Sequence, residues 1–124
     1  MDVLHTAIWV TDLETSKQFY EDILGLETSR EFVGGDGVTN CFMTGKSSAE
    51  IQFKYDETID VEISPGTMDH LAVEVQDVDA TAERAVEEWG SNIIDGPREM
   101  EDLDIRIAFI TDPEGYTIEI IQRV

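Results

Sequence analysis

The sequence has one cysteine and no run of apolar residues long enough to cross a bilayer. A single cysteine excludes an internal disulfide, and the place of Cys41 in the apolar run 40–43 predicts a buried core thiol rather than a reactive one. No charged-then-apolar leader opens the chain. We therefore expect a cytoplasmic protein that does not enter a membrane.

Basic residues are also scarce: eight lysines and arginines stand against 28 aspartates and glutamates, for a net charge of −20. Nucleic acid is a poor partner for such a chain, because phosphate binding requires basic patches. An acidic face for a cationic ligand would concentrate the acids, whereas here they are spread along the chain. We favour a surface adapted to a halophilic, high-salt cytoplasm, where screening relieves the self-repulsion.

A repeat divides the 124 residues, which are enough for one domain with a hydrophobic core. Residues 69–79 (DHLAVEVQDVD) nearly copy residues 5–14 (HTAIWVTDLE) at a shift of 65 positions. The shift aligns His5 with His70, Ala7 with Ala72, Val10 with Val75, Asp12 with Asp77, Glu14 with Asp79, and Gly25 with Gly90. The only two histidines therefore occupy equivalent positions in two halves.

Alternation and helical periodicity predict the order strand–helix–strand–strand–strand in each half. For the first half we expect strands at 4–10, 26–32, 38–44 and 49–55, and a helix at 13–25 capped by Asp12 or Thr15 and ended by Gly25. For the second we expect strands at 69–75, 91–94, 105–110 and 116–122, a helix at 79–89 ended by Gly90, and a loop at 96–102. A polar linker, 56–66, ends with Pro65-Gly66.

These elements predict an α+β fold made of two βαβββ modules, residues 1–60 and 67–124, within a single domain of residues 1–124. Neither module could bury its sheet alone. We expect an open, curved, eight-stranded mixed sheet around a cavity, with the helices outside.

Four polar residues lie on the strand faces opposite the apolar ones. His5 and His70 begin the first strand of each module, and Gln52 and Glu119 lie on the last strands, 47 and 49 residues later. Two imidazoles, a carboxylate and an amide oxygen suit a divalent first-row metal ion, with room for water or substrate. The alternative is that they face solvent or pair locally, and Glu50 competes with Gln52 for its role; the equivalent positions favour the metal.

Three segments carry a family resemblance: HTAIWVTDLETSKQFYEDILGLE, DHLAVEVQDVDA and IAFITDPEGYTIEIIQ. With them the chain resembles the vicinal oxygen chelate superfamily, and it is most similar to short glyoxalase I-like proteins. In that branch the positions matching His5, His70 and Glu119 are metal ligands. Two positions depart from it: Gln52 replaces a second ligand glutamate, and Trp9 replaces an arginine that grips the carboxylate of glutathione, which argues against glutathione as the thiol.

The resemblance implies a lyase or isomerase of the glyoxalase I type. Such an enzyme converts the hemithioacetal of methylglyoxal and a thiol to a hydroxyacyl thioester through a metal-bound enediolate. The divalent metal (nickel, cobalt, manganese, zinc or iron) stabilises the developing negative charge. Glu119 is the candidate base. The candidate substrate contacts, Trp9, Glu50, Lys54 and Glu74, include two carboxylates that could be a second acid or base. The family also implies a homodimer.

Other activities of the superfamily stay open as alternatives. A glutamine at the ligand position of Gln52 resembles some methylmalonyl-CoA epimerases, but the chain lacks a basic patch for a CoA phosphate. A dioxygenase would need a further histidine, and a fosfomycin-type transferase would need more cationic groups than Lys54 and Arg106. The alternative that is not an enzyme is a metal-free, bleomycin-resistance-like protein that binds a small cationic ligand.

The acidic composition predicts that salt stabilises the protein. The thermal unfolding midpoint should rise through a series from low salt to molar potassium chloride, because screening weakens repulsion among the excess acids. Differential scanning calorimetry over that series measures the effect, and an unchanged midpoint in molar salt would contradict the salt-adaptation hypothesis.

Overall fold

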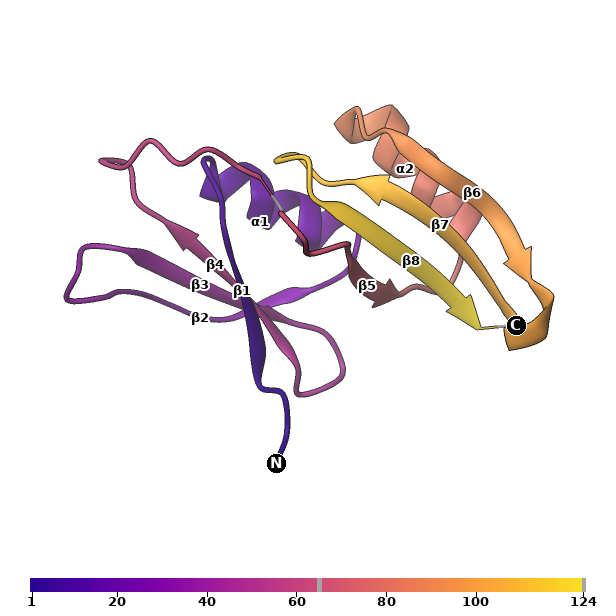
Figure 1. The fold of residues 1–124 in the computed structure, drawn as a ribbon, viewed down its shortest axis with the longest axis horizontal. Coiled ribbons are helices and arrows are strands. Elements are labelled where there is room, and N and C mark those ends of the chain that lie inside the picture. The colour runs from indigo at the N-terminus through magenta and orange to yellow at the C-terminus, as the bar shows by residue number, and fades with distance from the viewer. Residues whose placement is uncertain (65, 124) are drawn as a thin grey trace. The chain divides into compact units, whose positions relative to one another are not determined.

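The computed structural model describes residues 1–64 and 66–123. Pro65 and Val124, which the predictions above place in the linker and at the end of the second module, lie outside the described residues. The chain divides into two compact units, Met1–Ile63 and Ser64–Val124 (Figure 1). Each unit is described by itself.

The first unit is a four-stranded sheet with one helix. Its elements are β1 (His5–Trp9), α1 (Leu13–Asp22), β2 (Glu27–Val33), β3 (Thr39–Thr44) and β4 (Glu50–Tyr55). The strand order is β1-β4-β3-β2, with β1 and β4 parallel and the other pairs antiparallel. The first and last strands of the module are therefore neighbours at one side of the sheet.

The second unit repeats this arrangement. Its elements are β5 (Leu71–Glu74), α2 (Val78–Trp89), β6 (Ile93–Met100), the short 3-10 helix η1 (Glu101–Leu103), β7 (Ile105–Thr111) and β8 (Thr117–Arg123). The order is β5-β8-β7-β6, again with only the first and last strands parallel. The predicted α+β class and the eight strands are confirmed, as two four-stranded mixed sheets with a helix in each unit.

Equivalent caps fix the ends of both helices. The Asp12 carboxylate accepts a hydrogen bond from the Thr15 backbone N–H at 3.1 Å, and Asp77 accepts one from the Ala80 N–H at 3.0 Å. These bonds satisfy N–H groups that have no partner within a helix, and the one at Asp12 lowers the pKa of that carboxyl. Gly90 caps the C-terminal end of α2 at φ +67°, as predicted, whereas the predicted end of the first helix at Gly25 is wrong, because α1 ends at Asp22 with Ile23 as its C-cap.

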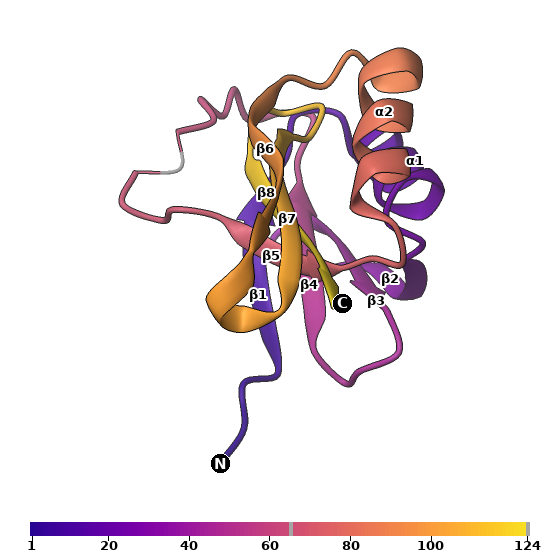
Figure 2. The ribbon, with the colours of Figure 1, turned by 90° about the vertical axis from the view of Figure 1, so that its right-hand side faces the viewer.

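Each core lies between a helix and one face of its own sheet. In the first unit the Tyr20 ring of α1 meets the Phe53 ring of β4 edge to face, with centroids 4.9 Å apart. Cys41 is fully buried, and burial raises the pKa of its thiol to about 11, which confirms the predicted core thiol. In the second unit α2 runs along one face of the sheet (Figure 2), with small residues Ala82 and Ala85 buried.

The predicted loop at 96–102 is wrong for most of its length, because β6 continues to Met100. Gly96-Pro97 resembles a turn signal but lies at an irregularity in the pairing of β6 with β7. Proline is tolerated there because β6 is an edge strand with one neighbour. The prediction that His70 begins its strand is also wrong, because β5 starts one residue later, at Leu71.

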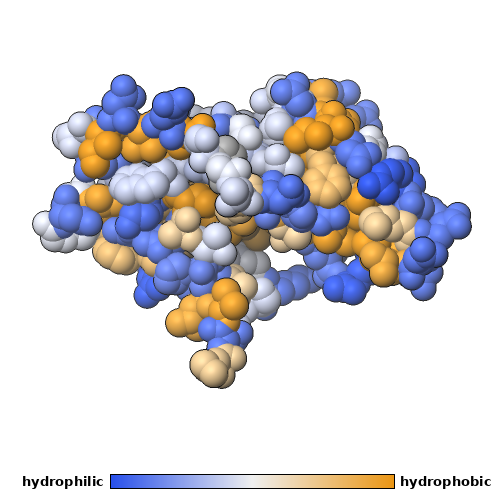
Figure 3. Space-filling model, in the orientation of Figure 1, coloured by the Kyte–Doolittle hydropathy of each residue, from blue (hydrophilic) through white to orange (hydrophobic). Residues whose placement is uncertain are grey.

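Polar side chains cover much of the face seen in Figure 3, with apolar groups between them. Exposed apolar residues include Val3 and Leu4 before β1 and Ile93 and Ile94 on β6. Among the described residues, no helix has the length and apolar character needed to span a membrane.

Among the glycines of the second unit, we expect Gly96 to be the one whose substitution lowers stability most. A Cβ at this position would lie 2.7 Å from the Ile107 carbonyl oxygen, and φ is +86°, whereas a Cβ on Gly90 meets nothing within 4 Å. We expect Gly96→Ala to lower the free energy of unfolding by about 3 kcal/mol or more, and Gly90→Ala by about 1–2 kcal/mol. Urea unfolding measures both, and equal losses would refute the close approach of β6 and β7.

Candidate functional site

The first unit carries the predicted residues on the sheet face opposite α1, called here the open face. The parallel register pairs His5 with Glu50, Ala7 with Gln52, and Trp9 with Lys54. Neighbours paired in register point to the same side of a sheet. The alternation predicted for β1 and β4 is thus confirmed, and His5 and Gln52 share one face.

Gln52 is held on this face by a chain of side-chain hydrogen bonds. Its Nε2 donates to Asn40 Oδ1 at 2.8 Å, and Asn40 Nδ2 donates in turn to the Val38 carbonyl at 3.0 Å. With its NH₂ group engaged, Gln52 keeps the amide oxygen as the atom available to a cation.

His5 packs against an aromatic ring. Its imidazole meets the Phe42 ring edge to face, at a centroid distance of 5.4 Å and an interplanar angle of 88°. Phe42 is the neighbour of Gln52 across the β3–β4 pair. The Phe42 ring therefore lies next to both predicted ligands: it contacts the His5 imidazole and is the cross-strand neighbour of Gln52.

The second unit brings its two predicted ligands together. His70 Nε2 lies 3.2 Å from Glu119 Oε1, with the side chains 29% and 15% exposed. The other imidazole nitrogen, Nδ1, lies 2.6 Å from Asp69 Oδ2. A histidine whose Nδ1–H donates a hydrogen bond to a carboxylate has its Nε2 lone pair available to a metal, which is the usual arrangement of a metal-binding histidine.

The aromatic contact is repeated as well. The His70 ring meets Phe109 edge to face at 5.2 Å and 88°, and Phe109 pairs with Glu119 across β7 and β8. Each unit thus holds a histidine, a phenylalanine and an oxygen-bearing side chain in the same relation. We call these sets the two half-sites: His5, Phe42 and Gln52, and His70, Phe109 and Glu119.

The donors of the half-sites fit a divalent metal ion. Imidazole nitrogen, carboxylate oxygen and amide oxygen are all ligands of first-row ions. A separation of 3.2 Å between His70 Nε2 and Glu119 Oε1 suits two adjacent ligands of one ion, since bonds of about 2.1 Å at right angles put their donors about 3 Å apart. Within residues 1–64 and 66–123, no three His, Cys, Asp or Glu side chains form a cluster suited to a metal; each half-site by itself holds at most two such residues.

The predicted substrate contacts differ in whether their charged groups already have oppositely charged or hydrogen-bonding partners. Lys54 Nζ lies 5.4 Å from the centroid of the Trp9 ring on the open face. Glu50, by contrast, accepts a hydrogen bond from Ser29 Oγ at 2.5 Å and lies 3.8 Å from an Arg30 guanidinium nitrogen. Such local partners leave Glu50 less able to act as an acid or base.

The last predicted contact, Glu74, lies on the same face as Glu119. Ala72 pairs with Glu119, and Glu74 lies two residues further along β5, so its side chain points to the same side of the sheet. It pairs with Arg123 at the end of β8. Glu74 is therefore also engaged in a local ion pair.

Several residues in or beside the half-sites were not predicted from the sequence: Asn40, Phe42, Asp69 and Phe109. The repeat contained a signal for the rings, because Phe42 and Phe109 are separated by 67 positions, as are Gln52 and Glu119. Asn40 could be found only from its contact.

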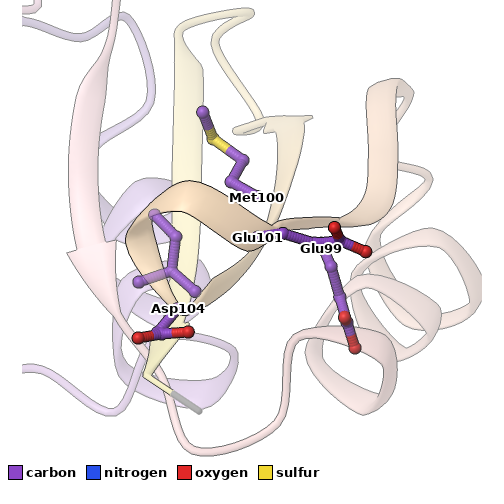
Figure 4. Close-up of a pocket in the computed structure, with 5 residues that line it drawn as sticks. Glu99, Met100, Glu101 and Asp104 are labelled. Carbon is purple, nitrogen blue, oxygen red and sulfur yellow. The ribbon is translucent and has the colours of Figure 1, made fainter.

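A small pocket in the second unit lies elsewhere, where β6 and β7 meet around η1 (Figure 4). Its lining contains none of the predicted site residues and consists of Glu99, Met100, Glu101, Asp104 and Ile105. With acidic and apolar groups alone, this pocket does not extend the half-site of His70 and Glu119.

Comparison with known proteins places these features in a family. The sequence model of a protein family, described as Glyoxalase/Bleomycin resistance protein/Dioxygenase superfamily, matches residues 2–120. Lactoylglutathione lyase of Haemophilus influenzae is 35% identical over 98% of this chain and 93% of that protein, and the Neisseria meningitidis enzyme is 35% identical over 99% and 91%. The structure of the trypanothione-dependent glyoxalase I of Leishmania major matches with a TM-score of 0.79 at 26% identity, over 98% of this chain and 86% of that chain.

The family match spans both units and both half-sites, and the relatives align along nearly their full length. The expected resemblance is therefore confirmed. This chain belongs to the Glyoxalase/Bleomycin resistance protein/Dioxygenase superfamily, in which its near relatives are lactoylglutathione lyases.

Proposed function

We propose that this protein is a metal-dependent enzyme of the glyoxalase I type. Its reaction would convert the hemithioacetal of methylglyoxal and a thiol to a hydroxyacyl thioester. The approach of His70 Nε2 to Glu119 Oε1 at 3.2 Å carries the proposal, since it places an imidazole nitrogen and a carboxylate oxygen where one ion would join them. The relatives named lactoylglutathione lyase support the reaction class.

The ligands would be His5 and Gln52 from one unit and His70 and Glu119 from the other. They would bind one divalent ion, nickel, cobalt, manganese, zinc or iron, with both half-sites drawn from one chain or from two chains of a homodimer. The bound ion would polarise substrate oxygens and stabilise negative charge that develops on them. Asp69 would keep the His70 ring oriented through Nδ1.

Glu119 would take the proton from C1 of the hemithioacetal, and a proton would then return to C2. Its carboxylate is suited to this because it is mostly shielded from solvent, at 15% exposed, and its near neighbour is an imidazole. Gln52 cannot share the task, because an amide takes no proton at neutral pH. The phenyl rings of Phe42 and Phe109 would support the imidazoles and limit water at the site.

The thiol half of the substrate would lie against Trp9 and Lys54. Within the described part of the chain Lys54 makes no ion pair with a carboxylate, and its ammonium lies over the indole of Trp9. That arrangement suits an anionic group on the thiol, which an ammonium binds by charge. The trypanothione dependence of the Leishmania major protein shows that the thiol varies within the family.

A metal-free protein that binds a small ligand is the second candidate, and an epimerase with the same ligand set is the third. The approach of His70 to Glu119, together with the placement of His5 and Gln52 on one sheet face, favours a metal site over the metal-free binding protein. An epimerase needs acid–base groups on both faces of its substrate, and Glu50 and Glu74 are held in local contacts.

Removal of the metal should abolish turnover and lower stability. We expect the protein stripped with a chelator to bind about one equivalent of nickel, cobalt, manganese or zinc, with a higher unfolding midpoint in the loaded form, because ligand binding to the native state stabilises it. Isothermal titration calorimetry measures the binding, thermal unfolding measures the stability, and an assay with methylglyoxal–thiol adducts before and after stripping measures the turnover. Absence of binding by all four ions would exclude the metalloenzyme.

Glu119→Gln should separate chemistry from metal binding. We expect kcat to fall by about 10²–10⁴-fold, because general-base catalysis contributes that much, while the amide oxygen still allows the metal to bind. The assay uses the methylglyoxal adducts of several thiols, and metal content is measured in parallel. Glu87→Gln, on the exposed face of α2, is the matched control. Unchanged kcat in Glu119→Gln would refute its role as base.

Lys54→Met should change substrate preference. We expect KM to rise about tenfold for adducts of thiols with a carboxylate, such as mercaptoacetate, and to stay unchanged for the adduct of the uncharged thiol 2-mercaptoethanol, because a hydrogen bond to a charged group is worth about 1.5–3 kcal/mol. Lys46→Met, in the exposed turn after β3, is the control. Equal effects on both adducts would show that Lys54 does not bind the anionic group.

A further inference from the structure

Asn40 is a polar residue in the apolar surroundings of β3, only 7% exposed. Its two side-chain groups are both satisfied: Nδ2 donates to the Val38 carbonyl at 3.0 Å, and Oδ1 accepts from Gln52 Nε2 at 2.8 Å. Turning the Asn40 amide over would put its oxygen against the Val38 oxygen and its NH₂ group against that of Gln52. The backbone carbonyl therefore fixes the direction of the whole chain of hydrogen bonds.

The direction of this hydrogen-bond chain determines which side chain fits at position 52. The atom that faces Asn40 Oδ1 must be a donor, and among glutamine and glutamate only glutamine has one at neutral pH. A carboxylate at position 52 would set two acceptors against each other next to a buried amide, which is costly. The same contact leaves Gln52 Oε1 as its uncommitted atom.

The second unit provides an internal comparison. A shift of 67 positions aligns Gln52 with Glu119 and Phe42 with Phe109, and it aligns Asn40 with Ile107. The pairing agrees, since Asn40 is opposite Lys54 and Ile107 is opposite Ile121, also 67 positions apart. Ile107 is 1% exposed and offers no hydrogen bond. An asparagine thus accompanies the amide, and an isoleucine accompanies the carboxylate.

We propose that Asn40 is a positioning residue, which turns the amide oxygen of Gln52 toward the metal and makes glutamine, rather than glutamate, the fitting residue at position 52. The proposal rests on the metal site proposed above. It also assigns the charge of the ligand set: His5, Gln52 and His70 are neutral donors, and Glu119 is the sole carboxylate. A divalent ion held by this set keeps a net positive charge, which favours an anionic substrate group.

The test compares four proteins of 124 residues: wild type, Asn40→Ile, Gln52→Glu, and the double variant, which reproduces the pair found in the second unit. Each is stripped of metal and titrated with manganese chloride and zinc chloride by calorimetry. We expect Asn40→Ile to bind metal about tenfold more weakly than wild type, because the loss of a residue that orients a ligand costs about 10–100-fold. Gln52→Glu should unfold at a lower temperature when metal-free, and adding Asn40→Ile should restore part of that loss.

Cys41→Ala is the matched control. Cys41 is buried on the same strand but faces the helix side, so this variant should lose stability without losing metal affinity. If Asn40→Ile behaves like Cys41→Ala, the residue has only a structural role and the inference is overturned. Failure of wild type to bind any of nickel, cobalt, manganese and zinc would instead overturn the proposed metalloenzyme.

A second measurement needs no metal. In nuclear magnetic resonance spectra of the metal-free protein, the Gln52 side-chain NH₂ protons should exchange slowly in wild type, because one of them is bonded to Asn40 Oδ1. In Asn40→Ile they should exchange as fast as those of exposed glutamines such as Gln18. Equal exchange in the two proteins would show that Asn40 does not hold Gln52, whatever the outcome of the metal titration.

Discussion

The parallel pairing of first and last strands is the constraint on which each unit depends. A parallel pair needs a long crossover, and here a helix and two further strands provide it. The pairing brings His5 and Gln52 onto one face although 47 residues separate them, and it brings Ala72, two residues from His70, beside Glu119. Without it, neither half-site would exist. The caps at Asp12 and Asp77 serve the same geometry, because they start each helix directly after its first strand.

On this shared frame the two half-sites differ in chemistry. Both hold a histidine edge to face against a phenylalanine, with ring distances of 5.4 and 5.2 Å. The difference lies beside the oxygen donors on the same sheet face, in the polar Asn40 of one unit and the apolar Ile107 of the other. A duplicated module can therefore keep its geometry while one buried position decides whether the donor beside it is an amide or a carboxylate.

The repeat, the strand alternation and the turn residues were enough to predict both modules and the faces on which their polar residues lie. The errors have local causes. Gly96-Pro97 has the composition of a turn, yet an edge strand accommodates it through an irregular register with β7. The pairing of β5 begins after His70, because strand ends are set by the neighbour's hydrogen bonds and not by the strand's own residues.

The sequence by itself determined the α+β modules, their duplication and the four candidate ligands, because periodicity and spacing are local properties that a single chain displays. Only the tertiary structure decided which atoms of those ligands are available. It assigned the Gln52 NH₂ group to Asn40, placed His70 Nδ1 against Asp69, and tied Glu50 and Glu74 to partners of their own. Hydrogen bonds of this kind join residues from different strands or depend on side-chain orientation, which no spacing along the chain encodes.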